Sequence, residues 1–184
     1  MLWLDHIYVR TEARIYVYTL IPVTKKLKLN PNVSYMLGLY QCSPDGEVGI
    51  VTESPDLVQK FIKLLMDEFG VAPNKVLVTE SGKDTKVMTY NSSLKKLFKG
   101  ALERKLKVFK WRNAYSANYI AGIFDCNGGA DAQGLYIRNL VEGDSMLLEM
   151  LGVHTFRKGS KTYFVNQNTL LGMIKDYSLK LGSD

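Results

Sequence analysis

The 184-residue sequence predicts an α+β fold of two pseudo-symmetric repeats, each combining helices with a small antiparallel sheet and joined through two central helices. One observation behind this is an apolar, glycine-bearing segment at residues 35–46 that is copied at residues 119–129. A second is the constant offset of 84 residues (122 − 38) between Gly38 and Gly122 and between the two cysteines. The third is that helix and strand patterns follow both copies in the same order.

Each copy places a glycine and a cysteine four positions apart, so the two residues share one face of a helix. Gly38 with Cys42, and Gly122 with Cys126, are small enough to let another backbone approach closely. We therefore expect these four residues to form the interface between the repeats. Our preferred interpretation of the cysteines is that they are small packing residues, and a disulfide between the repeats is the alternative.

Composition and charge set the broad class. The chain carries 24 basic and 18 acidic residues, a net charge of +6, which favours a polyanionic partner. Two cysteines without a nearby histidine cluster exclude a disulfide scaffold and a zinc ribbon. Charged residues interrupt the N-terminus, and the apolar stretch Ile15–Val23 is shorter than the roughly 20 residues that span a bilayer. We expect a soluble, intracellular protein with no membrane contact.

Residues 1–29 are expected to form an N-terminal extension outside the repeats. His6–Val9 and Arg14–Leu20 are rich in β-branched and aromatic residues, and Arg10–Ala13 is a polar connection between them. This pattern predicts a β-hairpin that ends at Pro22.

The first repeat is expected to span residues 30–107. Asn32 or Ser34 can cap its glycine helix, Ser54-Pro55 opens an amphipathic helix that Gly70 ends, and Asn91 or Ser92 caps a last helix. Turn residues and alternation place strands at Val48–Thr52, Val76–Glu80 and Thr85–Tyr90.

Residues 108–118 form a basic linker to the second repeat at 119–184. The second repeat is shorter but keeps the same order of elements. We expect a glycine helix at about 115–126, a glycine-rich turn, a strand near Gln133–Asn139, a helix at Met146–Leu151, a hairpin of Val153–Arg157 with Lys161–Val165, and a helix from Asn168.

The two copies resemble the motif of LAGLIDADG homing endonucleases in their single-chain, two-repeat form. The second copy reads IAGIFDCNG at residues 120–128, and the weaker first copy reads MLGLYQCSP at residues 36–44. With the shared order of elements, the resemblance covers residues 34–181. It implies that the motif helices pack along a pseudo-twofold axis, and that two curved sheets form a saddle on double-stranded DNA.

The sequence departs from the family at the eighth motif position. Active members place a carboxylate there in each copy to hold divalent metal between the scissile phosphates. This chain has Ser43 and Asn127 instead, and neither supplies the negative charge that a hard cation needs. Asp45 and Asp125 remain as candidate catalytic residues, although Asp125 is rotated about 200° from position eight and also suits local hydrogen bonding at the glycine-rich turn.

Alternation along the strands predicts which side chains face nucleic acid. Tyr136 and Arg138 lie opposite Leu135 and Ile137, while Phe156 and Phe164 are expected in the core and Tyr163 faces outward. The candidate DNA-binding residues are Lys83, Lys86, Tyr136, Arg138, Arg157, Lys158 and Lys161. The alternative is that these are ordinary solubilising charges.

The densest basic run lies between Lys95 and Arg112, with eight basic residues against Glu103 alone. This run therefore carries +7, and the rest of the chain carries −1 (6 − 7). It covers the last helix of the first repeat and the linker, away from the expected saddle floor. Our preferred interpretation is a solvated helix face and linker, and the alternative is that the run contacts flanking nucleic-acid backbone.

Three functions are compatible with these patterns. The first is a DNA-binding protein of the homing-endonuclease type with reduced or lost cleavage and no cofactor. The second is an active site-specific endonuclease that uses Mg²⁺, and the third is an RNA maturase for structured RNA or a DNA-binding regulator on the same scaffold. Two fused repeats already supply an internal twofold, so a monomer is expected. The resemblance also implies an association with an intron or intein.

Overall fold

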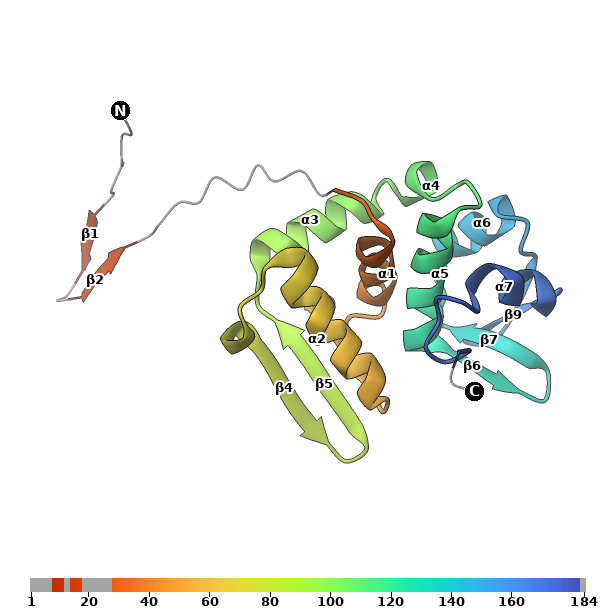
Figure 1. Ribbon diagram of the computed structural model, residues 1–184, viewed down its shortest axis with the longest axis horizontal. Coiled ribbons are helices and arrows are strands. Elements are labelled where there is room, and N and C mark those ends of the chain that lie inside the picture. Colours follow the sequence, from red (N-terminus) through yellow and green to blue (C-terminus); the bar gives the residue numbers. More distant parts are fainter. Residues whose placement is uncertain (1–7, 12–13, 18–27, 183–184) are drawn as a thin grey trace.

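The computed structural model describes residues 8–11, 14–17 and 28–182 (Figure 1). Strands β1 (Tyr8–Thr11) and β2 (Arg14–Val17) pair antiparallel, with Tyr8 opposite Val17 and Thr11 opposite Arg14. The predicted N-terminal hairpin is confirmed within these residues, except that Arg10 and Thr11, expected in the connection, belong to strand β1. The other residues predicted for it, including Pro22, lie outside the described part of the chain.

The first repeat follows the predicted order. Helix α1 (Pro31–Tyr40) leads through the 3-10 turn η1 (Pro44–Gly46) to strand β3 (Val48–Thr52) and helix α2 (Pro55–Phe69). A second 3-10 turn, η2 (Pro73–Lys75), precedes the hairpin of β4 (Val76–Ser81) and β5 (Asp84–Thr89), and helix α3 (Ser92–Leu102) follows. The three strands form one antiparallel sheet in the order β3-β5-β4.

The second repeat begins after the short helix α4 (Lys105–Val108). Helix α5 (Ala114–Asn127) leads into β6 (Gly128–Asp131) and β7 (Gly134–Arg138), and helix α6 (Glu142–Met150) follows. Strands β8 (Thr155–Lys158) and β9 (Lys161–Phe164) precede helix α7 (Gln167–Ile174). The sheet is antiparallel in the order β6-β7-β9-β8.

Helices α1 and α5 lie side by side at the centre of the molecule, with one sheet on each side (Figure 1). Their contact is close because both carry a glycine. A Cβ added at Gly38 would lie 2.1 Å from the carbonyl oxygen of Tyr119, and one added at Gly122 would lie 2.3 Å from that of Tyr35. Any larger residue at either position would force the two helices apart.

The helices begin and end near the capping residues expected from the sequence, but the cap of α1 is a different residue. The side chain of Asn30 accepts a hydrogen bond from Val33 N with Pro31 at the first helical position, so the expected caps Asn32 and Ser34 were wrong. Asn91 caps α3, and Gly70 ends α2 in the left-handed conformation, as predicted.

Two boundaries in the second repeat differ from the prediction. Residues 128–131, expected as a glycine-rich turn, form strand β6, because pairing with β7 supplies backbone hydrogen bonds that do not depend on side chains. Helix α6 begins at Glu142, four residues before the expected Met146, and its first turn holds the acidic residues Glu142 and Asp144.

The helices cover one face of each sheet, and the hairpins β4–β5 and β6–β7 extend to the same end of the molecule (Figure 1). Val48, Ile50 and Val87 line the covered face of the first sheet, and Ile137, Thr162 and Phe164 line that of the second. The opposite faces together form the predicted saddle. Within the described residues, no helix combines the length and apolarity needed to cross a membrane.

Candidate nucleic-acid interface

The ends of α1 and α5 meet at the floor between the two sheets. Ser43 lies just after α1, and Asn127 is the last residue of α5. The hydroxyl of Ser43 is buried and has no hydrogen-bond partner among the described residues. Both eighth motif positions are therefore neutral, and the Ser43 hydroxyl is buried beneath the floor.

Cys42 and Cys126 form a disulfide, with their Cα atoms 6.3 Å apart. The preferred interpretation of these residues as unbonded packing residues was wrong. The reason lies in the symmetry of the contact: close approach at the glycines brings equivalent positions of both helices together one turn further on. The bond links the two repeats next to Ser43 and Asn127.

Asp125 is buried and bonded to the C-terminal segment. Its carboxylate accepts hydrogen bonds from Tyr35 Oη at 2.5 Å, Leu179 N at 2.8 Å and Lys180 N at 3.2 Å, and from the hydroxyl of Ser178. These partners are distant in sequence, so the expected local bonding within the glycine-rich turn was wrong, although Lys180 Nζ also donates to the carbonyl oxygen of Gly128 at 2.7 Å. All its hydrogen bonds serve packing of the chain, so its oxygens are not presented to the floor.

The burial of Tyr35 raises the pKa of its hydroxyl well above the ordinary value, and the negative charge of Asp125 raises it further. The equivalent Tyr119 also has a pKa well above the ordinary value, because of burial and the charge of Asp144. Tyr119 Oη donates to Asp144 Oδ1 at 2.8 Å and accepts from Gln41 Nε2 at 2.8 Å. Both tyrosines are thus neutral hydrogen-bond donors to buried carboxylates.

The donor set at the floor does not fit a hard divalent cation. A serine hydroxyl and an asparagine amide are neutral, while Asp125 is committed to four donors. Such cations in proteins are bound through one or two carboxylates. Among the described residues, no three histidine, cysteine or acidic side chains are placed together to hold a metal. The side chain of Asp45 lies outside what the structure describes.

The open face of the second sheet carries an aromatic and basic cluster. Strand pairing puts Tyr136 opposite Tyr163, which is opposite Phe156, so the three rings share one face. Phe156 stacks on Tyr163 with ring centroids 5.4 Å apart, and Tyr163 packs edge-on against Tyr136 at 5.8 Å. Although Tyr136 is on the predicted face, neighbouring side chains bury its ring.

Basic groups cover these rings. Lys161 Nζ lies 4.1 Å from the centroid of the Tyr136 ring and pairs with Asp131 Oδ2 at 2.6 Å. Arg138 Nη2 donates to Tyr136 Oη at 3.3 Å. Tyr163 Oη also donates to Asp131, at 3.0 Å, and Lys158 lies opposite Lys161 on the same face. The carboxylate holds the lysine, and Arg138 remains exposed.

The prediction for β8 had its two faces exchanged. Phe156, expected in the core, lies on the open face with 48% of its surface exposed, and Arg157 is on the helix-covered side opposite Thr162. Strand β8 is at the sheet edge, where a covered-side residue such as Arg157 extends past the helices into solvent. The pairing pattern alone distinguishes these alternatives.

The open face of the first sheet carries exposed apolar side chains beside polar ones. Val51 and Leu77 are 41% and 47% exposed, and strand pairing puts Lys86 beside Val51 on that face. Lys83 is exposed at the tip of the β4–β5 hairpin. The predicted basic residues therefore occupy both sides of the saddle but unequally.

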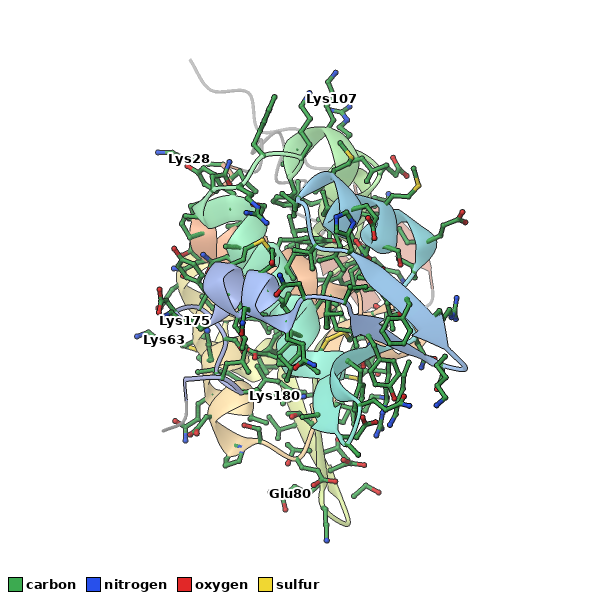
Figure 2. All side chains as sticks on the ribbon, turned by 90° about the vertical axis from the view of Figure 1, so that its right-hand side faces the viewer. Lys28, Lys63, Glu80, Lys107, Lys175 and Lys180 are labelled. Carbon is green, nitrogen blue, oxygen red and sulfur yellow. A yellow bond between two sulfur atoms is a disulfide. The ribbon has the colours of Figure 1, made fainter. Side chains whose placement is uncertain are left out.

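The basic run between Lys95 and Arg112 lies away from the hairpins. Figure 2 shows Lys107 at the end of the molecule opposite Glu80, which is near the tip of the β4–β5 hairpin. Lys95 pairs with Glu47 at 2.6 Å and Lys105 with Asp144 at 2.7 Å. The other basic residues of the run are not part of the saddle.

Comparisons with known proteins agree with this architecture. No family model matches the sequence, and no curated protein matches it. Among solved structures, the fold is similar to mesophilic variants of the homing endonuclease I-DmoI, with a TM-score of 0.61 and 18% identity over 84% of this chain and 97% of that chain. I-DmoI in complex with DNA and manganese matches with a TM-score of 0.59 and 18% identity, over 78% and 96% of the two chains.

A variant of I-DmoI bound to its target DNA in the presence of manganese is similar to the same degree, with a TM-score of 0.60 and 18% identity over 78% of this chain and 93% of that chain. I-DmoI is a single-chain LAGLIDADG homing endonuclease. The structural resemblance to this fold predicted from the two motif copies is thereby confirmed.

Proposed function

We propose that this chain binds double-stranded DNA along the open faces of its two sheets and does not cleave it by the metal mechanism of its structural neighbours. The observation that carries the binding proposal is the shared face of Arg138, Lys158 and Lys161 in the second sheet. Lysine and arginine at such positions bind phosphates, and arginine also bonds to guanine edges. Similar folds are solved with target DNA bound, which supports the same use here.

The loss of cleavage rests on the neutral ends of the motif helices. A metal held there would activate water and neutralise charge on the leaving oxygen, but Ser43 and Asn127 do not provide the carboxylates it requires. The chain's own groups at the floor leave DNA binding as the function that its chemistry supports. A single chain with both repeats suffices for it.

The test is selection of binding sites from a random duplex library, followed by affinity measurements at several salt concentrations. We expect a selected duplex whose affinity falls steeply with salt, because each neutralised phosphate releases counterions. Lys161→Gln should lower the salt slope by about one, the value for one phosphate contact. Absence of any selected duplex, or a slope unchanged by salt, would overturn the binding proposal.

The selected duplex then tests cleavage with Mg²⁺ or Mn²⁺. We expect no specific cutting by the natural chain, and metal-dependent cutting only after Ser43→Asp and Asn127→Asp are combined. Because Ser43 is buried, the folded state of the double variant is checked by its DNA affinity before cleavage is scored. Site-specific cutting by the natural chain would establish the endonuclease alternative instead.

A further inference from the structure

We infer that a cleft outside the saddle, between the start of α5 and α7, binds an unpaired nucleotide of a single-stranded nucleic acid. The cleft has a volume of about 530 Å³. This volume is within the range of small-ligand sites, roughly 300–1,000 Å³, and leaves room for a nucleobase with its sugar. The inference is separate from duplex binding by the sheets and does not depend on it.

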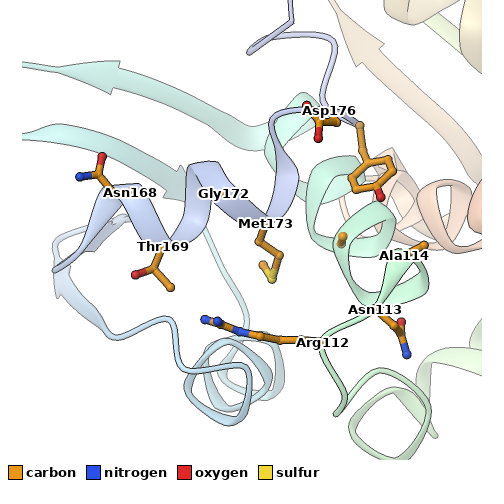
Figure 3. A pocket seen from close by; sticks show the side chains of 10 residues that line it. Arg112, Asn113, Ala114, Asn168, Thr169, Gly172, Met173 and Asp176 are labelled. Atoms are coloured by element: carbon orange, nitrogen blue, oxygen red, sulfur yellow. The ribbon is translucent and has the colours of Figure 1, made fainter.

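The lining of the cleft suits a base. Figure 3 shows Arg112 extending under α7, with Thr169 and Met173 of α7 directed toward it and the acidic Asp176 near the end of the same helix. The Asn113 amide oxygen caps α5, so the donors and acceptors left for the edge of a base are the guanidinium of Arg112, the hydroxyl of Thr169 and the carboxylate of Asp176. Met173 supplies an apolar surface for the face of the base. Tyr177 adds an aromatic ring to the lining.

Arg112 is held in place by the fold. Its Nε donates to the carbonyl oxygen of Leu151 at 2.6 Å, which restrains the guanidinium at the lining of the cleft. The remaining guanidinium nitrogens provide donors for a phosphate or a base oxygen. The cleft therefore contains a positioned cation and not only a mobile surface side chain.

The chain segment that leads into Arg112 is basic and aromatic. Trp111 directly precedes Arg112, and 67% of its surface is exposed with Lys110 Nζ 5.1 Å from its ring. Lys107 and Arg104 are also exposed on the same connection, and neither forms an ion pair within the described part of the chain. An exposed indole among cations is the arrangement that stacks an unpaired base and follows a phosphate backbone.

A duplex does not fit this site. The bases of a duplex are stacked on one another, so neither an exposed indole nor a cleft can accept one without unpairing it. The ligand is therefore an unpaired stretch of RNA or DNA, and the two sugars are distinguished by experiment.

The experiment measures fluorescence anisotropy of labelled RNA and DNA oligonucleotides of about 12 nucleotides at low salt. We expect saturable binding of at least one of the two oligonucleotides. The one that binds more tightly shows whether the site prefers ribose or deoxyribose. In a Trp3→Phe background, Trp111 is the remaining tryptophan of the two in the chain, and its emission should be quenched on binding. Trp111→Ala should weaken affinity about tenfold, as expected for one stacked base.

Gly172 allows the cleft itself to be tested. A Cβ at this α7 position meets nothing within 4 Å, so the fold leaves open space for the first atom of a side chain there. We expect Gly172→Phe to fill the cleft and weaken oligonucleotide binding at least about tenfold, while the matched control Gly172→Ala binds as the natural chain does. The urea midpoints of both variants verify folding.

Three results would overturn the inference. They are no saturable binding of either oligonucleotide, unchanged affinity in Gly172→Phe, and a loss of oligonucleotide affinity in Lys161→Gln but not in Gly172→Phe. The last would locate the oligonucleotide on the open sheet face. Failure of duplex binding would leave this site unaffected, so the two proposals fail independently.

Discussion

The two repeats differ in the residue at the sixth motif position, which is Gln41 in the first copy and Asp125 in the second. Tyr35 and Tyr119 are related by the offset of 84 residues, and each bonds across the centre to position six of the other helix. That partner is Asp125 for Tyr35 and Gln41 for Tyr119. The two contacts have equivalent positions but differ in charge. Of the two central helices, α5 therefore contributes a buried carboxylate to its contact, and α1 contributes a neutral amide.

The two carboxylates of this region do different work as a result. Asp125 bonds to Tyr35 and also holds the C-terminal segment through Ser178, Leu179 and Lys180. On the other side the carboxylate is Asp144 of α6, which is paired with Lys105 at 2.7 Å. Asp125 is therefore an anchor for the chain end, which explains an acid in the motif without assigning it to catalysis.

The largest expected effect comes from breaking the link that both repeats share. Reducing Cys42–Cys126 opens a loop of 84 residues, and the chain-entropy relation gives about 4–5 kcal/mol of lost stability. Urea unfolding with and without reductant measures it, with Cys42→Ser combined with Cys126→Ser as the control that reductant should not affect. The same midpoint in both redox states would show that the bond contributes nothing.

A smaller effect should distinguish Asp125 from Gln41. Asp125→Ala leaves buried donors without an acceptor and should lower the free energy of unfolding by about 3–5 kcal/mol, whereas Gln41→Ala removes one hydrogen bond and should cost about 1 kcal/mol. Hydrogen exchange at Leu179 N should accelerate only in Asp125→Ala, since that amide bonds to the carboxylate. Equal losses in both variants would remove the proposed distinction between the repeats.

The sequence predicted the order of helices and hairpins because those signals are local. Ser54-Pro55 and Gly70 delimit α2 through backbone preferences, and the hairpin residues at 81–84 favour a tight turn. The repeated glycines also predicted the central contact, since one offset relates both copies.

What sequence reasoning missed depends on distant partners. Asp125 meets Ser178 across 53 residues, and no local pattern indicates that pairing. The cysteines occupy equivalent positions, but equivalence does not fix the distance between them. An aromatic residue is compatible with either face of a sheet, so Phe156 of β8 was assigned to the core. The cluster of Phe156, Tyr163 and Tyr136 became visible only with the strand register. Alternation read from Tyr163 across a paired strand would have found it.

The smallest effect is a pH dependence that tests the symmetric part of the contact. In the unfolded chain a tyrosine loses its proton near pH 10, whereas the raised pKa values of buried Tyr35 and Tyr119 keep both protons in the folded state. Their contribution to stability is therefore fully present below pH 10 and is lost as the pH rises further, by about 1.4 kcal/mol per pH unit for each tyrosine.

Tyr35→Phe and Tyr119→Phe should each remove one such increment from the alkaline slope of urea unfolding. Burial lowers the pKa of Lys60 and Lys180 and acts in the opposite direction, so the comparison is between each variant and the natural chain. An unaltered slope in either variant would show that its tyrosine titrates alike in both states, and that the paired contacts are not equivalent.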